Sequence, residues 1–129
     1  MIAVDSSALV AVMRHEADEE RIHATLQAAD GAVISTVNLL ELQLVLAGRR
    51  SLASWHEVEV ILGQYLIDPR PFDERQLRFA REAALRYGKG RHKAALNFGD
   101  CFAYALAKSE DIPLLCTGGG FALTDAALA

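Results

Sequence analysis

Short apolar runs alternate along the chain with longer segments whose apolar residues recur at helical spacing. The apolar runs predict strands at residues 2–4, 32–34 and 113–116. The helical spacing predicts helices over residues 8–13, 16–29, 36–47, 51–66, 74–87 and 98–109. Strands that alternate with helices are typical of an α/β domain with a central parallel sheet flanked by helices. Ligands of such a sheet gather at the carboxyl ends of its strands.

Residues that start or stop helices lie between these segments. Ser6 or Ser7 can cap the first helix, and Asp73 can cap the fifth. Pro69 and Pro71 prevent the fourth helix from continuing. The boundaries therefore agree with the periodicity.

The length and composition favour one folded domain over residues 1–129. Of the 129 residues, 52% are hydrophobic and 23% charged, which allows a core to form and excludes a disordered chain. No apolar run approaches the roughly 18 residues that a membrane span needs, and the first residues lack a signal-peptide pattern. Cys101 and Cys116 show no zinc-ligand spacing and lie in apolar stretches. We therefore expect a cytoplasmic protein with two reduced, buried thiols.

Three acidic residues stand at positions where a polar side chain is unexpected. Asp5 follows the first strand, Glu41 interrupts a strongly apolar helix, and Asp100 lies early in another apolar helix. Each has a structural alternative: Asp5 as a helix cap, Glu41 as a solvent-facing residue, and Asp100 as a partner of the helix dipole. Burial of an unpaired carboxylate would cost roughly several kcal/mol of folding free energy. If the three acids lie close together, their charges also repel one another, and a bound cation would relieve this repulsion. Mg²⁺ or Mn²⁺ fits oxygen ligands and the hydrolysis of phosphodiesters.

The net charge of −4 is distributed unevenly. Residues 73–93 carry seven bases and three acids, and the rest of the chain has an excess of acids. The basic residues closest to the loop after the fifth helix are candidate RNA-backbone contacts: Arg86, Lys89, Arg91 and Lys93. A solvated helix face and loop would have the same composition.

Three segments of the chain, in this order, resemble the motifs of a known protein family. They are Val4-Asp5-Ser6-Ser7-Ala8-Leu9, Ile34-Ser35-Thr36 leading to Glu41, and Asn97-Phe98-Gly99-Asp100-Cys101. The chain resembles a PIN domain of the VapC toxin type over essentially its whole length. The resemblance implies a metal-dependent endoribonuclease that forms a homodimer and is silenced by a VapB-type antitoxin. It also implies that Asp5, Glu41 and Asp100 coordinate the metal, and that Ser6 or Ser7 supports them by hydrogen bonding.

One segment departs from the family pattern. The family usually has an acidic residue just before a phenylalanine after the last strand, whereas this chain has Gly120 before Phe121. Asp125 lies nearby and is a further candidate acid. The absence of the fourth acid leaves an alternative open, in which a catalytically weakened PIN-like protein binds antitoxin or RNA.

Overall fold

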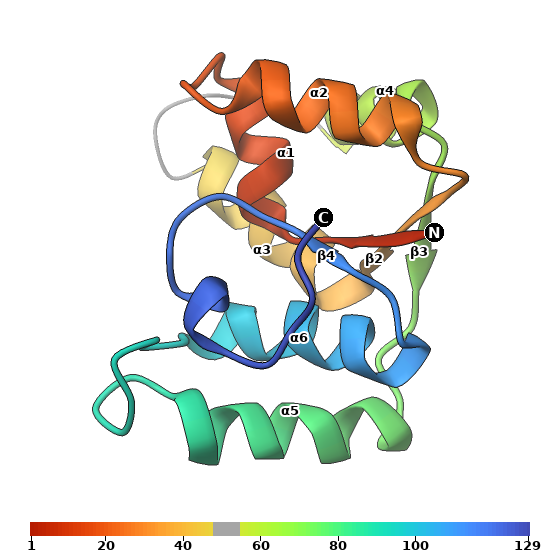
Figure 1. The fold of residues 1–129 in the computed structure, drawn as a ribbon. Coiled ribbons are helices and arrows are strands. Elements are labelled where there is room, and N and C mark those ends of the chain that lie inside the picture. The colour runs from red at the N-terminus through yellow and green to blue at the C-terminus, as the bar shows by residue number, and fades with distance from the viewer. Residues whose placement is uncertain (48–54) are drawn as a thin grey trace.

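The computed structural model describes residues 1–47 and 55–129 and places a parallel sheet between two layers of helices (Figure 1). The strands are β1 (Ile2–Val4), β2 (Ala32–Ser35), β3 (Ile67–Arg70) and β4 (Leu114–Leu115). The helices are α1 (Ser6–Met13), α2 (Glu19–Ala28), α3 (Thr36–Ala47), α4 (Trp55–Gln64), α5 (Glu74–Tyr87), α6 (Phe98–Glu110) and the 3₁₀ turn η1 (Phe121–Leu123). The predicted α/β class with a parallel sheet is confirmed.

The two faces of the sheet carry separate cores. Ile2 and Val4 face a cluster formed with α1, α2, α3 and α4, whereas Ala3 faces a second cluster formed with α5 and α6. Figure 1 shows α2 and α4 on one side of the sheet and α5 and α6 on the other. Because side chains alternate across a strand and both faces are covered, every residue of β1 and β2 is buried. This explains why these strands are continuous apolar runs in the sequence.

The strand order places Asp5 at the carboxyl end of a central strand. The order is β3-β2-β1-β4, and β1 pairs in parallel with both β2 and β4. The chain moves outward from β1 to β2 and β3, and then returns to the opposite side of β1 as β4. Such a reversal opens a crevice beyond the carboxyl ends of the two strands that flank it. Asp5 follows β1 and Thr117 lies just beyond β4, so both stand at this crevice.

The edge strand β3 was not predicted. It pairs in parallel with β2, and Ile67 is buried while Asp68 and Pro69 are exposed. With one partner strand, β3 tolerates a proline that a central strand would exclude. Its sequence therefore has neither the alternation nor the apolar run that indicates a strand. The predicted start of the fourth helix at residue 51 lies outside the described residues.

Helix boundaries shift by a few residues elsewhere. The second helix begins at Glu19 rather than at residue 16, because a turn closed by Glu19 N to Glu16 O (3.0 Å) precedes it. Helix α6 runs one residue beyond the predicted end, to Glu110.

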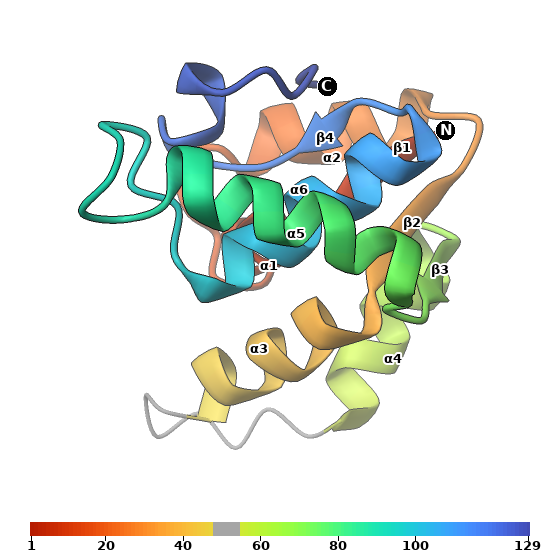
Figure 2. The same cartoon turned by 90° about the horizontal axis from the view of Figure 1, so that it is seen from below.

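The apolar helix α3 is less covered than its composition indicates. Leu40 is 59% exposed, Leu44 is 64% exposed, and Val45 is also exposed. Such an apolar sequence favours burial over most of the helix circumference, but α3 buries only Asn38, Leu39, Leu42 and Leu46 in this chain. Figure 2 shows α3 at the outside of the molecule, beside the layer of α5 and α6.

None of the helices within the described residues has the length and apolarity needed to span a bilayer. Cys101 and Cys116 are free thiols, and both are buried.

Candidate functional site

Asp5 caps helix α1 and still keeps one carboxylate oxygen uncommitted. Its Oδ2 accepts hydrogen bonds from the Ser7 backbone N–H at 3.0 Å and from the Ser7 hydroxyl. The Ser7 hydroxyl oxygen also accepts a bond from Thr117 N at 3.1 Å, which ties the end of β1 to the segment after β4. Asp5 Oδ1 is buried and has no hydrogen-bond partner among the described residues. The cap and the functional interpretation therefore use different oxygens of one side chain.

Glu41 turns from α3 toward the same end of the sheet. Its Oε1 accepts hydrogen bonds from the Ser6 hydroxyl and, at 3.2 Å, from Asn38 Nδ2. Asn38 is fully buried and also donates to the Gly99 carbonyl at 3.0 Å, so it joins α3 to the start of α6. Glu41 is half-buried and hydrogen-bonded, and it is not a free solvent-facing residue.

Asp100 occupies the third position of α6 and forms a capping box with Asn97. The Asn97 backbone N–H donates to Asp100 Oδ2, and the Asp100 backbone N–H donates to Asn97 Oδ1, each at 2.9 Å. This reciprocal pair fixes the carboxyl group at the helix N-terminus, where the helix dipole favours a negative charge.

The three acids line one cleft of about 280 Å³. The other lining residues are Ser6, Ser7, Val10, Glu16, Val45, Asn97 and Thr117. The predicted convergence of Asp5, Glu41 and Asp100, with both serines beside them, is therefore a feature of the structure.

Burial and nearby negative charge raise the pKa values of Asp5 and Asp100. Desolvation raises the pKa of Asp5 from 3.8 to about 6, and the charges of Asp100 and Glu41 add to the increase, although the two bonds from Ser7 oppose it. The pKa of Asp100 is also raised, mainly by desolvation and further by Glu41. Carboxylates that repel one another in this way favour a bound cation.

The donor set of the cleft fits a hard divalent cation. Within the described residues, no group of three or more His, Cys, Asp or Glu side chains is gathered closely enough to hold a metal ion by itself. The cleft nevertheless offers carboxylate oxygens from four acids, Asp5, Glu16, Glu41 and Asp100, and Asp5 Oδ1 is buried without a hydrogen-bond partner among the described residues. Mg²⁺ typically binds through one or two carboxylates and keeps several waters, so a complete protein cage is not required.

Comparison with known proteins decides the family. The PIN domain family matches residues 2–126. Ribonuclease VapC30 of Mycobacterium tuberculosis is 40% identical over 126 residues, covering 98% of this chain and 96% of that protein. Ribonuclease VapC of Mycolicibacterium smegmatis is also 40% identical, with 98% of each chain covered. The chain belongs to the VapC group of PIN-domain proteins.

Solved structures show the same fold at low sequence identity. Mycobacterium tuberculosis VapC20, described as a toxin that cleaves the sarcin-ricin loop, superposes with a TM-score of 0.79 at 16% identity. The match covers 100% of this chain and 98% of VapC20. VapBC2 from Rickettsia felis, bound to a DNA fragment from its promoter, gives a TM-score of 0.75 at 14% identity over 99% and 96% of the two chains.

Asp125 lies outside the acidic cleft of this PIN domain. It accepts hydrogen bonds from Tyr104 Oη at 2.8 Å and from Lys108 Nζ at 3.1 Å, and Arg86 Nη1 lies 3.8 Å away. Partial burial opposes its ionisation, but the bonds from Tyr104 and Lys108 prevail and lower the pKa of Asp125. The expectation that Asp125 is a further acid of the site is corrected, because its carboxylate is committed to this separate network.

Gly120 does not line the cleft either. It precedes η1 with an ordinary helical φ of −61°, and a Cβ at this position would stand 2.8 Å from the carbonyl oxygen of Ala94. The residue of this segment that reaches the cleft is Thr117.

The four basic residues predicted to contact RNA differ in how many intramolecular partners they have. Arg86 approaches Glu82 at 3.7 Å and Asp125 at 3.8 Å, and it lies over the Tyr87 ring at 4.8 Å from its centroid. Lys89, Arg91 and Lys93 are exposed on the loop between α5 and α6. Arg86 therefore has intramolecular partners that compete with an RNA phosphate.

Sequence reasoning missed three polar residues of the site. Asn38 donates a hydrogen bond to Glu41, and the Thr117 backbone N–H donates one to the Ser7 hydroxyl. Glu16 lines the cleft from the turn before α2. Asn38 has a sequence signal, because a polar amide stands three residues before Glu41 in a mainly apolar helix. Thr117 acts through its backbone N–H, which leaves no signal in the residue type.

Proposed function

We propose that this PIN domain is a divalent-metal-dependent endoribonuclease in which Asp5, Glu41 and Asp100 hold Mg²⁺ or Mn²⁺. The observation that supports it most directly is the buried Asp5 Oδ1, which lacks a hydrogen-bond partner in the described residues and lies in a cleft also lined by Glu41, Asp100 and Glu16. A buried carboxylate oxygen without a partner carries a desolvation penalty that a cation would offset. The names of the VapC relatives agree with ribonuclease activity.

The serines and Asn38 act as positioning residues. Ser7 fixes Asp5 through Oδ2 and leaves Oδ1 directed elsewhere, while Ser6 and Asn38 both donate to Glu41 Oε1. Each of these two acids therefore has one oxygen restrained by the protein. This preorganisation limits the side-chain entropy that would be lost when a ligand binds.

When bound, the divalent cation neutralises charge on the scissile phosphate and activates a water nucleophile. Because water attacks rather than the neighbouring 2′-hydroxyl, the expected products carry 5′-phosphate and 3′-hydroxyl ends. Lys89, Arg91 and Lys93 would position the RNA backbone without reading its sequence. We assign Arg86 a smaller part in RNA binding because its guanidinium group already lies close to Glu82 and Asp125.

The decisive experiment incubates the purified, antitoxin-free protein with structured RNA and Mn²⁺, with EDTA as the control. Cleavage that requires the metal and leaves 5′-phosphate ends supports the endoribonuclease. Binding of RNA without cleavage at saturating Mn²⁺ would favour the alternative, a catalytically weakened module whose missing acid at Gly120 prevents turnover.

A VapB-type antitoxin is the partner that we propose, and it would make this protein the toxin of a toxin-antitoxin pair. Structures with the same fold include a toxin-antitoxin complex from Klebsiella pneumoniae and VapBC2. The chain also has a groove of about 630 Å³ between α1, α2 and α4. Apolar Val12 and Ile61 line it together with Glu19, Glu20 and Glu57, a pattern suited to an amphipathic segment with basic flanks. Addition of the cognate antitoxin should abolish cleavage.

A homodimer is the assembly that we propose. The exposed apolar residues Leu40, Leu44 and Val45 form one surface on α3 that a second copy would cover. Size-exclusion chromatography with light scattering tests the mass. We also place the protein in the cytoplasm, in keeping with its free thiols and its RNA substrate.

A further inference from the structure

A further hollow, mainly apolar, adjoins the acidic cleft. It has a volume of about 550 Å³ and lies between α5, α6 and the loop that joins them. Its apolar lining includes Phe72, Leu77, Phe98, Cys101 and Phe102. None of these side chains has a role in the proposed hydrolysis.

Phe98 is held at the edge of this hollow while remaining open to solvent. It is the first residue of α6 and is 79% exposed. Its ring meets Phe102 edge to face, with centroids 4.9 Å apart, and Phe102 in turn meets Phe72 at 4.8 Å. Phe98 is therefore supported by a chain of aromatic contacts and still offers most of its surface to a ligand.

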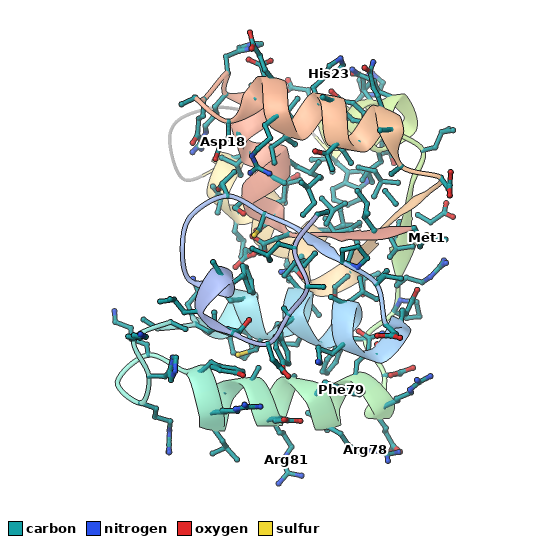
Figure 3. All side chains as sticks on the ribbon, in the orientation of Figure 1. Met1, Asp18, His23, Arg78, Phe79 and Arg81 are labelled. Carbon is teal, nitrogen blue, oxygen red and sulfur yellow. The ribbon has the colours of Figure 1, made fainter. Side chains whose placement is uncertain are left out.

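Two cations line the same hollow. Arg81 comes from α5, where Figure 3 shows it on the side away from the sheet, and Lys89 comes from the loop that follows. The loop is anchored at this point, because Lys89 N donates to the Leu96 carbonyl at 3.0 Å. Neither Arg81 nor Lys89 forms an ion pair within residues 1–47 and 55–129. An aromatic ring beside uncommitted cations complements a base and its phosphate.

The hollow and the acidic cleft share one lining residue. Asn97 lines both, and Phe98 and Gly99 alone separate it from Asp100 in sequence. An RNA strand whose scissile phosphate lies at Asp100 would therefore carry a neighbouring nucleotide to Phe98.

We propose that this hollow binds an unpaired nucleobase next to the scissile phosphate, with Phe98 stacked on the base and Arg81 and Lys89 contacting the adjoining phosphate. The inference rests on the proposed function for its substrate class. Base stacking on an aromatic side chain is tolerant of sequence, so the subsite would select single-stranded RNA rather than a particular base. The two cations favour RNA over a second copy on this side of Phe98, whereas the α3 side of Phe98 is lined almost entirely by apolar residues.

The test measures binding without cleavage. The probe is a short fluorescent uridine oligonucleotide, compared with an oligonucleotide of the same length made of abasic riboses, and affinity is measured by anisotropy in EDTA. Phe98→Ala should weaken binding of the uridine oligonucleotide by about tenfold and leave binding of the abasic one unchanged. Phe98→Trp should restore the preference for bases. Leu85→Ala is the matched control, because Leu85 is 60% exposed on α5 and does not line the hollow.

The cations are tested with the same two probes. Arg81→Gln with Lys89→Gln should weaken binding of both oligonucleotides, because both retain phosphates. Arg75→Gln with Arg78→Gln removes the same charge from α5 outside the hollow and should have a smaller effect. Neither Arg75 nor Arg78 lines the hollow.

Three outcomes would overturn the proposal. These are an equal loss for both oligonucleotides in Phe98→Ala, an equal loss in Leu85→Ala, and a fall from dimer to monomer mass in Phe98→Ala, which would assign the hollow to a second copy. Failure of the proposed function has a different signature, because absence of Mn²⁺-dependent cleavage by the parent protein leaves the binding result in EDTA intact.

Discussion

Gly99 on α6 lies so close to Glu41 on α3 that a Cβ atom at position 99 would overlap the Glu41 carboxylate. The Gly99 carbonyl also accepts the bond from Asn38, whose amide reaches Glu41 as well. Glycine is therefore required here by the close approach of an acidic side chain of the cleft. It is not required by an unusual backbone conformation, since Gly99 lies within a regular helix.

Gly99→Ala should displace Glu41 without unfolding the protein. The obstructing group is the end of a flexible side chain, so Glu41 can rotate away, but it would then lose its bond from Ser6. We expect Mn²⁺-dependent RNA cleavage to fall about tenfold, as for loss of a group that orients a metal ligand. Gly63→Ala is the control, because its added Cβ would meet no described atom within 4 Å apart from its chain neighbours and the backbone of its own helix. Parent-like cleavage in Gly99→Ala would mean that the position of Glu41 is unimportant.

Removal of any one acid of the cleft should reduce cleavage and preserve the fold. Asp5→Asn, Glu41→Gln and Asp100→Asn should each lower Mn²⁺-dependent cleavage by roughly tenfold or more, because each replaces a carboxylate oxygen of the proposed metal site and removes a negative charge. Asp111→Asn, at the far end of α6, is the control and should cleave like the parent. Circular dichroism verifies the fold, and full activity in all three variants would exclude this cleft as the catalytic site.

The stability of the metal-free protein should depend on pH through Asp5. Its folded pKa of about 6 lies above the ordinary 3.8, so the folded state binds the proton more tightly than the unfolded state. Protonation of Asp5 therefore stabilises the folded state. This stabilisation is fully present below the ordinary pKa of 3.8 and is lost as pH rises through about 6. Above that pH, Asp5→Asn should raise the free energy of unfolding by on the order of 3 kcal/mol in EDTA.

Urea unfolding of the parent and of Asp5→Asn, repeated from acid to neutral pH, measures this difference. The difference should grow as pH rises and then level off. Asp125→Asn should have the opposite sign, because the lowered pKa of Asp125 means that its ionised form stabilises the folded state. A constant difference between the parent and Asp5→Asn at all pH values would show that Asp5 is not destabilised by its burial.

The loop cations should determine part of the salt dependence of RNA binding. Arg91→Gln with Lys93→Gln should reduce the slope of log affinity against log salt by about 0.7 for each phosphate of a single strand that these side chains neutralise in the parent. The comparison is Arg75→Gln with Arg78→Gln, which removes the same charge from the exposed face of α5. If both pairs change the slope equally, the loop has no special role in binding RNA.

The sequence predicted the sheet class and the three acids for a physical reason. Parallel strands buried on both faces are apolar runs, and an acid that follows such a run or interrupts an apolar helix stands out against its neighbours. Asp5, Glu41 and Asp100 were recognisable in this way, and the structure brings them to one cleft.

Other features had no comparable signal. The strand β3 buries Ile67 while Asp68 and Pro69 remain exposed, so its sequence lacks strand periodicity. The direction in which a side chain at position 120 would point depends on how the segment after β4 packs against Ala94. This packing is an interaction between distant parts of the chain. The exposure of Leu40 and Leu44 likewise depends on which neighbours α3 has in space.

The family resemblance suggests that Gly120→Asp would add a fourth acid and tighten metal binding, but the packing of Gly120 predicts a cost first. The Ala94 carbonyl that a Cβ would meet at 2.8 Å is backbone and moves less readily than a side chain. We therefore expect Gly120→Asp to lower the free energy of unfolding by about 1–3 kcal/mol, as overpacking does. Gly119→Asp is the matched control, because a Cβ at position 119 would meet no described atom within 4 Å apart from its chain neighbours. Urea unfolding and calorimetric titration with Mn²⁺ decide between the two expectations.

A tighter Mn²⁺ affinity in Gly120→Asp at unchanged stability would show that this segment turns its side chain into the acidic cleft. Loss of stability without a gain in affinity would place position 120 outside the metal site.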